Sequence, residues 1–437
     1  TINGGEFHCK NGIFGAGRGT NYYYSTNYYG GSATNYKALG RTFGNVELDI
    51  NGGTFYCPIF GGGYGVADAQ LKNSNTIETL TDMASLVGKS TVNIMGGTFF
   101  ENIYGGGDMA NVRYSKAEKY ATNVTIGEEA DIRGSVFAGG NGRALRPSTQ
   151  GFKEGDDLTQ SPEKVGLVDG STSLTFTGNT QLSPYIYGDI YGGGNLAQVS
   201  GDTHINIYAA HFAGQIFGGG NGKIDTNTTT NTTTTTSADI LGNTHVTLSR
   251  DYGGQEDGED SKKKDNFSIN VIWNKIWDST NKKFIEWTDA DTKEENDNFF
   301  KDGKFINPHN IYGGGNLACK VTGVATVEVL KGMTPFELLE TQQWKSSYTD
   351  NKNPHFSVFG GGYGANTQVG STDVTVNVEG DYGVYDAEVD DNTDQLARPH
   401  TKNNKNKARK AARSGTSEQK DNNTLPVFDN SKGIPNF

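Results

Sequence analysis

The chain has little of three features that organise many other proteins: cysteine, proline and long apolar runs. Its 437 residues include 3 cysteines, 10 prolines and no apolar stretch near the roughly 20 residues that span a bilayer as a helix. Three cysteines form neither a disulfide scaffold nor a four-cysteine zinc site. Positive charge is also scarce, since 38 basic residues face 50 acidic ones for a net charge of −12. The sequence therefore predicts no nucleic-acid partner and no membrane span within these residues.

Glycine is the residue that the chain has in excess. It contributes 61 of 437 residues, about twice its usual share. The glycines follow no every-third-residue period, which excludes collagen. A helical bundle is also disfavoured, because each glycine inside a helix costs about 1 kcal/mol relative to alanine. The glycines instead gather in clusters, and such clusters indicate a repeat.

A pair of one aliphatic and one aromatic residue, followed by glycines, recurs along the whole chain. The eight pairs are Ile13-Phe14, Ile59-Phe60, Ile103-Tyr104, Val136-Phe137, Ile190-Tyr191, Ile216-Phe217, Ile311-Tyr312 and Val358-Phe359. Alternating apolar and polar residues, typical of half-buried strands, lie at 46–50, 92–94, 124–126, 174–176, 205–207, 246–248, 327–329 and 374–378. The shortest distance between glycine turns is 26 residues, from Gly192 to Gly218. This length fits one coil of a parallel β-solenoid and is too short for a propeller blade.

The repeat predicts an all-β fold: a single-stranded right-handed parallel β-helix of about eight coils, with long loop insertions and a few short helices. The aliphatic ladder is expected inside the rod. The aromatic ladder should point outward or lie under an insertion, because neighbouring strand residues face opposite sides. It is then either a platform for sugar rings or, as we favour, a structural stack. The glycines are expected to supply backbone angles that are closed to other residues.

The insertions leave the repeat after the glycine turn or after the first strand. We place the β-helix at 1–380, with insertions at 18–45, 64–90, 108–121, 141–171, 221–242, 249–309 and 331–356, and a flexible basic tail with the start of a further coil at 381–437. Residue spacing predicts short helices near 76–87 and 334–344, and a β-hairpin at 268–288 with its turn at 279–282. The threonine tract at 226–236 is expected to be flexible.

Aromatic residues in the insertions are the candidate ligand-binding residues. They are Tyr22, Tyr23, Tyr24, Tyr28, Tyr29, Trp273, Trp277, Trp287 and Trp344. Cys9 and Cys57 occupy matching places in the segments GGEFHC and GGTFYC, so adjacent coils could bring them within disulfide range. The sequence leaves this disulfide undecided, because later coils place Glu101 and Gly134 at the same position. Cys319 has no partner cysteine in the repeat pattern.

The sequence indicates no metal, cofactor or catalytic centre. The GGxGx turns resemble the calcium-binding β-roll repeat, but the position of its carboxylate holds Ala67, Ala144, Ile224 and Asn366. Among the outward strand positions, only Glu47 and Asp49 are near each other, and they have no basic partner. The histidines fall at unmatched repeat positions and assemble no catalytic set: His8, His204, His211, His245, His309 and His355. We therefore predict no cofactor, no metal site and no catalytic residue.

The units NGGTF, followed by IFGGG or IYGGG, resemble the right-handed parallel β-helix repeats of large secreted bacterial surface proteins, the adhesin-like group that shares its fold with pectate lyases. The resemblance implies a non-enzymatic extracellular or cell-surface rod whose aromatic loops bind a carbohydrate or a host or partner protein. The alternatives are a polysaccharide lyase or glycoside hydrolase of the parallel β-helix type, and a purely structural stalk. Residues 1–5 align with 49–53, in mid-coil, so we expect a segment of a longer solenoid, with further coils at both ends and any signal or anchor outside it.

Overall fold

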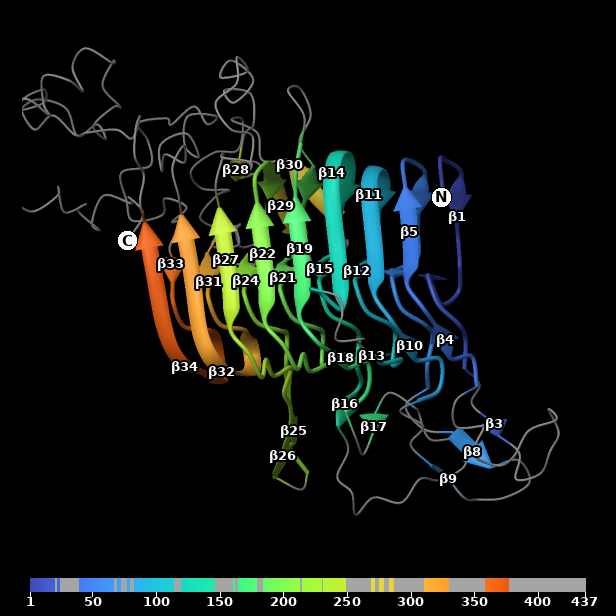
Figure 1. Ribbon diagram of the computed structural model, residues 1–437. Helices are drawn as coiled ribbons and strands as arrows, with labels where there is room; N and C mark the ends of the chain where they lie inside the picture. Colours follow the sequence, from blue (N-terminus) through green and yellow to red (C-terminus); the bar gives the residue numbers. More distant parts are fainter. Residues whose placement is uncertain are drawn as a thin grey trace, which may run out of the picture.

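The computed structural model is a rod of parallel coils and confirms the all-β parallel β-helix (Figure 1). The structure describes residues 1–19, 22–23, 39–66, 69–71, 77–78, 82–113, 119–145, 160–161, 164–178, 184–212, 214–229, 231–248, 269–271, 275–278, 283–286, 310–329 and 358–376. Across these ranges no helix is long and apolar enough to cross a membrane. The predicted boundary at 380 and the tail at 381–437 lie outside the described residues.

Three sheets form the walls of the rod, and their strands pair in parallel from one coil to the next. The long sheet has 13 strands: β1 (Glu6–Phe7), β5 (Val46–Ile50), β6 (Thr54–Phe55), β11 (Ser90–Phe99), β14 (Thr122–Ile132), β19 (Thr172–Phe176), β20 (Tyr185–Ile186), β22 (Thr203–Ile207), β23 (Ala210–Phe212), β27 (Thr244–Leu248), β28 (Ile269–Val271), β32 (Asn316–Val329) and β34 (Tyr363–Val376). In Figure 1 most of them stand side by side from the N-terminal to the C-terminal end.

The second wall is an 8-stranded sheet of two-residue strands: β2 (Ile13–Phe14), β7 (Ile59–Phe60), β12 (Ile103–Tyr104), β15 (Val136–Phe137), β21 (Ile190–Tyr191), β24 (Ile216–Phe217), β31 (Ile311–Tyr312) and β33 (Val358–Phe359). Each coil contributes one of these strands, so the expectation of about eight coils is confirmed. The third wall pairs β4 (Thr42–Phe43), β10 (Leu86–Val87), β13 (Val112–Arg113) and β18 (Val168–Asp169), and isolated bridges through Val199, Ile240 and Val321 continue it.

The aliphatic residue of each repeat lies inside the rod, as predicted. Ile59, Ile103, Val136, Ile190 and Ile216 have no exposed surface and belong to the main hydrophobic core. The inward residues of the long sheet pack against them, among them Ile94, Ile126 and Phe176. A column of like side chains forms because adjacent coils repeat the same position in register, and each side chain covers its neighbour.

Six of the eight rings of the aromatic ladder are buried rather than outward-facing, while Phe14 is partly buried and Phe359 is 44% exposed. Its rings stack at centroid distances of 4.6–5.0 Å and interplanar angles of at most 12°. They form a second hydrophobic cluster, in which Phe217 has no exposed surface and Tyr312 only 5%. Residues that directly follow the glycine triplets lie over the rings, since Tyr64 tilts against Phe14 and the amide of Asn316 donates to the hydroxyl of Tyr191. The ladder is therefore a structural stack, and sugar rings cannot reach the faces of its buried members.

The glycine turns are explained by close approach of the coils rather than by unusual backbone angles. The triplet glycines of the turns are not among the residues with positive φ, whereas the corner glycines Gly53 and Gly97 are. A Cβ on Gly193 would lie 2.8 Å from the backbone N and Cα of Gly220 in the next coil. The expectation that the turn glycines supply forbidden backbone angles is therefore wrong. They are required because a side chain would separate neighbouring coils.

A buried row of hydroxyl groups ties the long sheet to the glycine turns. Thr203 donates to the carbonyl oxygen of Gly218 at 2.6 Å, and Thr244 donates to that of Gly313 at the same distance. The hydroxyl ladder consists of Ser90, Thr122, Thr172, Thr203 and Thr244, each bound to the turn of its own coil. These hydroxyls satisfy carbonyl groups that the narrow interior hides from water.

Polar side chains at two corners join each coil to the next. We call these contacts corner staples: an oxygen of one coil accepts a backbone N–H from the coil that follows. In one row the donor–acceptor pairs are Ser135 to Asn102, Asp189 to Ser135, and Gln215 to Asp189; in the other they are Asp202 to Ser171, Asn243 to Asp202, and Val324 to Asn243. The staples supply partners where the sheets end.

The insertions contain short strands where helices or flexible chain were expected. The helix predicted at 76–87 is wrong, because β9 (Ile77–Glu78) and β10 lie there instead. β9 pairs with β8 (Ala69–Leu71), which pairs with β3 (Tyr22–Tyr23). The threonine tract forms an antiparallel hairpin of β25 (Lys223–Asn227) and β26 (Thr232–Thr236), which projects from the rod in Figure 1. β16 (Ala144–Leu145) and β17 (Gln160–Ser161) form a further pair.

The hairpin predicted at 268–288 is confirmed in a narrower form. β29 (Lys275–Asp278) and β30 (Lys283–Glu286) pair in antiparallel register, whereas β28 joins the long sheet beside β23. The turn at 279–282 and the helix predicted at 334–344 lie outside the described residues.

Candidate functional site

The aromatic residues predicted from the insertions mostly fall outside the part of the chain that the structure describes. The backbone of Tyr22 and Tyr23 lies in β3, opposite Gln70 and Leu71, and that of Trp277 lies in β29, opposite Phe284. Tyr24, Tyr28, Tyr29, Trp273, Trp287 and Trp344 lie outside the described residues. Ligand binding by these loop residues stays a prediction.

The first two coils bring Cys9 and Cys57 together as free thiols. Burial and the neighbouring Cys9 raise the pKa of Cys57 to about 11, so its thiol is protonated at neutral pH. The disulfide between them stays a prediction. Cys9 also borders a shallow pocket of about 240 Å³, to which Lys10, Arg18 and Tyr64 contribute.

A column of flat side chains runs along the outside of the rod, and four of its five members are exposed, whereas Tyr187 at its end is buried. We call it the outer ring column: His8, Tyr56, Phe100, Arg133 and Tyr187, each of which directly follows a strand of the long sheet. The rings of His8 and Tyr56 stack at 4.4 Å, and those of Tyr56 and Phe100 at 4.7 Å. The guanidinium of Arg133 continues the stack, 5.2 Å from the centroid of Phe100 and 5.9 Å from that of Tyr187.

A polar column lies beside the outer ring column, two residues earlier on each strand. It consists of Glu6, Thr54, Thr98, Asp131 and Tyr185, which are register partners from coil to coil. Glu6 lies 2.7 Å from His8, and Asp131 lies 2.9 Å from Arg133. Five rungs at the usual strand spacing make a strip about 19 Å long. Tyr56, Phe100 and Tyr185 keep 43%, 40% and 44% of their surface exposed.

The stacking decides which parts of the rings a ligand can reach. Each inner ring of the column is covered on both faces by its neighbours, so its edge points outward. A flat ligand cannot stack there face to face. The edges, together with the carboxylate, hydroxyl and guanidinium groups of the polar column and Arg133, instead present an alternating apolar and hydrogen-bonding surface.

Two histidines share one register position on the outer face of the long sheet. His204 of β22 and His245 of β27 are direct register partners, and their rings stack at 4.7 Å with an interplanar angle of 4°. Asp202 completes the group, in which the three ligand atoms lie within 4.8 Å of one another. The expectation that the histidines fall at unmatched repeat positions is wrong for this pair.

The surroundings keep His204 neutral. Burial, followed by repulsion from His245, lowers the pKa of His204 to about 4. The ring of Tyr120 meets His204 edge-on at 5.4 Å, and Lys119 lies over Tyr120. At neutral pH the imidazole of His204 therefore has a free lone pair, which is the form that binds cations.

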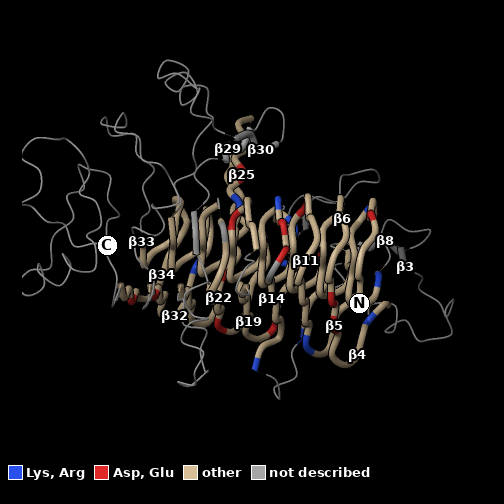
Figure 2. Tube along the Cα trace, turned by 90° about the horizontal axis from the view of Figure 1, so that it is seen from above, with Lys and Arg blue, Asp and Glu red and all other residues tan. Residues whose placement is uncertain are grey.

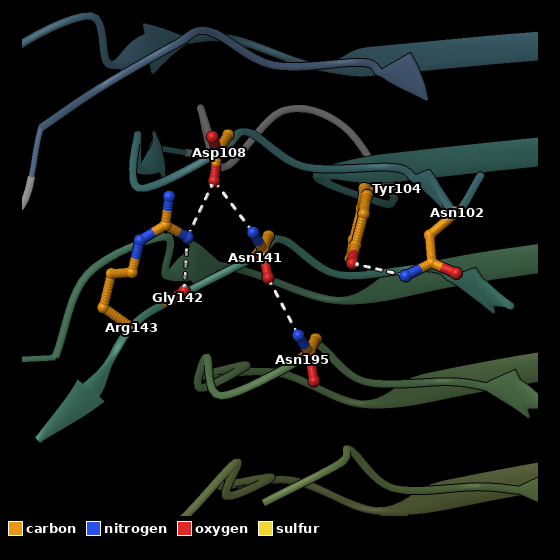
Figure 3. Close-up of polar contacts among 7 residues, drawn as sticks. All are labelled: Asn102, Tyr104, Asp108, Asn141, Gly142, Arg143 and Asn195. Carbon is orange, nitrogen blue, oxygen red and sulfur yellow. Dashed lines mark hydrogen bonds and ion pairs between the residues drawn. The ribbon is translucent and has the colours of Figure 1, made fainter. Parts of the chain in front are cut away.

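An asparagine ladder crosses the turns that follow the glycines (Figure 3). Asn195 donates to Asn141 at 2.9 Å, and Asn141 donates to Asp108 at 2.8 Å, where Arg143 also donates at 3.2 Å. Asn221 and Asn316 extend the ladder towards the C-terminal end. Burial raises the pKa of Asp108 despite these donors. The asparagines are half-buried and bind one another from coil to coil, so the role of the ladder is structural.

The carboxylates considered for catalysis are engaged with an amide. Asn93 donates to Asp49 at 2.9 Å and to Glu47 at 3.3 Å, and the outward register neighbour that follows is Thr125. Figure 2 shows acidic and basic residues interspersed along the coloured part of the rod rather than gathered by sign. The neighbouring coil thus gives the carboxylates of Glu47 and Asp49 a neutral hydrogen-bond donor, Asn93, and not the cationic partner that lyase chemistry uses.

Neither the outer ring column nor the histidine pair was found from the sequence. The outer ring column is hard to recognise in the sequence because the residue type at its position changes from an aromatic ring to a guanidinium between coils. The pair was visible, since His204 and His245 each precede an aliphatic–x–aliphatic strand by one residue. No family model matches the chain, and no curated protein and no solved structure is significantly similar to it.

Proposed function

We propose that the chain is the rod of a secreted or cell-surface bacterial protein of the adhesin type, and that it binds an extended carbohydrate chain without cleaving it. The observation that carries the proposal is the strip formed by the outer ring column and the polar column. It is continuous over five coils, exposed in every member of the outer ring column except Tyr187, and places one side chain of each column at every coil. A repeating surface is suited to a repeating polymer.

The chemistry of the strip favours carbohydrate over protein. Glu6, Asp131 and Arg133 offer charged groups to sugar hydroxyls, and Thr54 and Thr98 add hydroxyl groups between them. The ring edges of Tyr56 and Phe100 offer apolar contact to the carbon-bound hydrogens of a sugar. Protein interfaces, in contrast, are depleted of aspartate and glutamate at their centres. The mixed strip thus fits a ligand that is both hydroxyl-rich and partly apolar.

A glycan array probed with the purified chain tests the proposal, followed by titration with the best-binding oligosaccharide. The double variant Tyr56→Ala/Phe100→Ala should weaken binding by about 10-fold or more, because loss of two central contacts removes at least about 1.4 kcal/mol. Phe43→Ala is the matched control, since Phe43 is 73% exposed but lies on β4, in another wall. The control should bind as the unchanged chain does.

Three results would contradict this assignment. Binding that survives the double variant and is lost in Tyr22→Ala/Tyr23→Ala or Trp277→Ala would move the site to the insertions. If the chain binds no glycan on the array, carbohydrate binding is excluded, and a protein ligand or a purely structural stalk is favoured. Release of reducing or unsaturated sugar ends from acidic polysaccharides would support the lyase or hydrolase alternative instead.

A further inference from the structure

Two imidazoles lie on neighbouring strands of the outer face of the long sheet, and one carboxylate directly precedes the first of these strands. The residues at the histidine register position in the flanking coils are Ser173 before His204 and Thr326 after His245. The described part of this register position thus holds histidine on two consecutive coils with hydroxyl residues on either side. We propose that Asp202, His204 and His245 bind one divalent first-row transition-metal ion, with Zn²⁺ as the best match.

The distances suit a shared ion. Zn²⁺ binds histidine nitrogen at about 2.0–2.1 Å and carboxylate oxygen at about 2.0–2.2 Å, which puts two tetrahedral ligand atoms about 3.3 Å apart. The three candidate atoms already lie within 4.8 Å of one another. The two rings stand parallel with their centroids 4.7 Å apart, on strands that are direct neighbours. To bind one ion, the ligand atoms need to approach one another by at most about 1.5 Å, a shift that rotation about the side-chain bonds can supply.

The backbone holds the carboxylate in place. Oδ1 of Asp202 accepts the N–H of Asn243 at 2.7 Å, and the N–H of Asp202 donates to Ser171 at 3.0 Å. These are corner staples, so the fold fixes Asp202 beside His204 for a structural reason. Its second oxygen, Oδ2, makes no hydrogen bond to any other described residue and can bind an ion.

The ligand types select the class of ion. Two imidazoles and one carboxylate favour Zn²⁺ and neighbouring transition metals, whereas Ca²⁺ and Mg²⁺ prefer sites made of oxygen alone. The charge of Lys119 opposes a cation, but its side chain is exposed and screened by solvent. All three ligands are partly exposed, which leaves coordination positions for water. The ion would join two coils, because its ligands come from β22 and β27 and the segment before β22.

The test uses the full chain, stripped with a chelator and dialysed, and titrated with Zn²⁺ and with Co²⁺ as a spectroscopic probe. We expect one metal equivalent at this site, a visible Co²⁺ spectrum with nitrogen ligation, and a higher unfolding temperature with Zn²⁺, because an ion that binds only the folded state stabilises it. His204→Asn, His245→Asn and Asp202→Asn should each lower the affinity by about 100-fold or more, since outer-sphere changes alone cost 10- to 100-fold.

The controls separate this site from the other histidines. His8→Ala removes an imidazole that also has a carboxylate neighbour, Glu6, and should leave the stoichiometry unchanged. Asp202→Asn keeps the oxygen that accepts the N–H of Asn243, so it tests the metal without breaking the staple. Far-UV circular dichroism shows whether each variant is folded. Equal Zn²⁺ binding and equal Zn²⁺ stabilisation in the unchanged chain and in both histidine variants would overturn the proposal, as would no binding to the unchanged chain.

Discussion

Removing one hydroxyl from the buried ladder tests how the coils close. In Thr203→Val, a methyl group replaces a hydroxyl with almost no change of shape, so no cavity is created. The carbonyl of Gly218, which is buried, loses the hydroxyl donor at 2.6 Å, and no other donor to it is found among the described residues. A buried acceptor left unsatisfied costs about 1–3 kcal/mol.

The extra methyl group offsets part of that cost, by up to about 0.8 kcal/mol. We therefore expect Thr203→Val to lower the free energy of unfolding by about 1–2 kcal/mol. Urea titration followed by far-UV circular dichroism measures this as a lower midpoint with an unchanged slope. Two matched variants serve as controls. Thr203→Ser keeps the hydroxyl, as Ser90 does in an earlier coil, and Thr175→Val makes the same exchange on the outer face of β19.

The reasoning fails if Thr203→Val unfolds at the same urea concentration as Thr203→Ser. It fails equally if Thr175→Val is as destabilising as Thr203→Val, because the effect would then come from the exchange of threonine for valine itself. A large loss in Thr203→Val alone assigns the cost to the buried carbonyl.

Three further changes test the packing and the charge of the rod. Gly193→Ala should cost about 1–3 kcal/mol in urea unfolding, because its Cβ would meet the next coil at 2.8 Å, whereas Gly361→Ala, with no atom of the described residues within 4 Å, should be tolerated; equal losses would refute the close-approach argument. Phe137→Ala should cost about 3–5 kcal/mol, and a loss below 1 kcal/mol would contradict its role in the stack. Burial raises the pKa of Asp108 above 3.8, so its ionisation costs stability as pH rises from about 4 through the folded-state pKa. The free energy of unfolding of Asp108→Asn, measured relative to that of the unchanged chain, should therefore be higher at neutral pH than at acid pH. A relative stability that is the same at acid and at neutral pH would contradict the raised pKa of Asp108.

The coils were predictable because each coil of a narrow core requires an aliphatic residue at the same position of the repeat. Ile59, Ile103 and Ile190 occupy the same position in their repeats, so the repeat alone identifies them as core residues. The helix expected at 76–87 failed for a related reason. Leu86 pairs with Thr42 and Val112 of the neighbouring coils, and that pairing overrides the helical spacing of nearby apolar residues.

The polar interior was harder to foresee. Thr203 and Thr244 occupy inward positions, where alternation predicts apolar residues, and only the carbonyl of the facing turn explains them. The candidate sites depend on register between coils separated by insertions of unequal length. Aligning the strands places His204 opposite His245, but Asp202 joins them only through the corner staple that fixes its carboxylate.

The corner staples and the asparagine ladder make the rod directional. In both, the later coil donates and the earlier coil accepts, as when Asn141 donates to Asp108 and Asn243 to Asp202. At the C-terminal end of the ladder, Oδ1 of Asn316 is buried and accepts no hydrogen bond from any described residue. The two ends of a stack of such coils therefore differ in chemistry, one offering N–H groups and the other lone pairs. A coil added to such a stack therefore fits in one orientation only, because a coil of reversed direction would bring donor against donor or acceptor against acceptor.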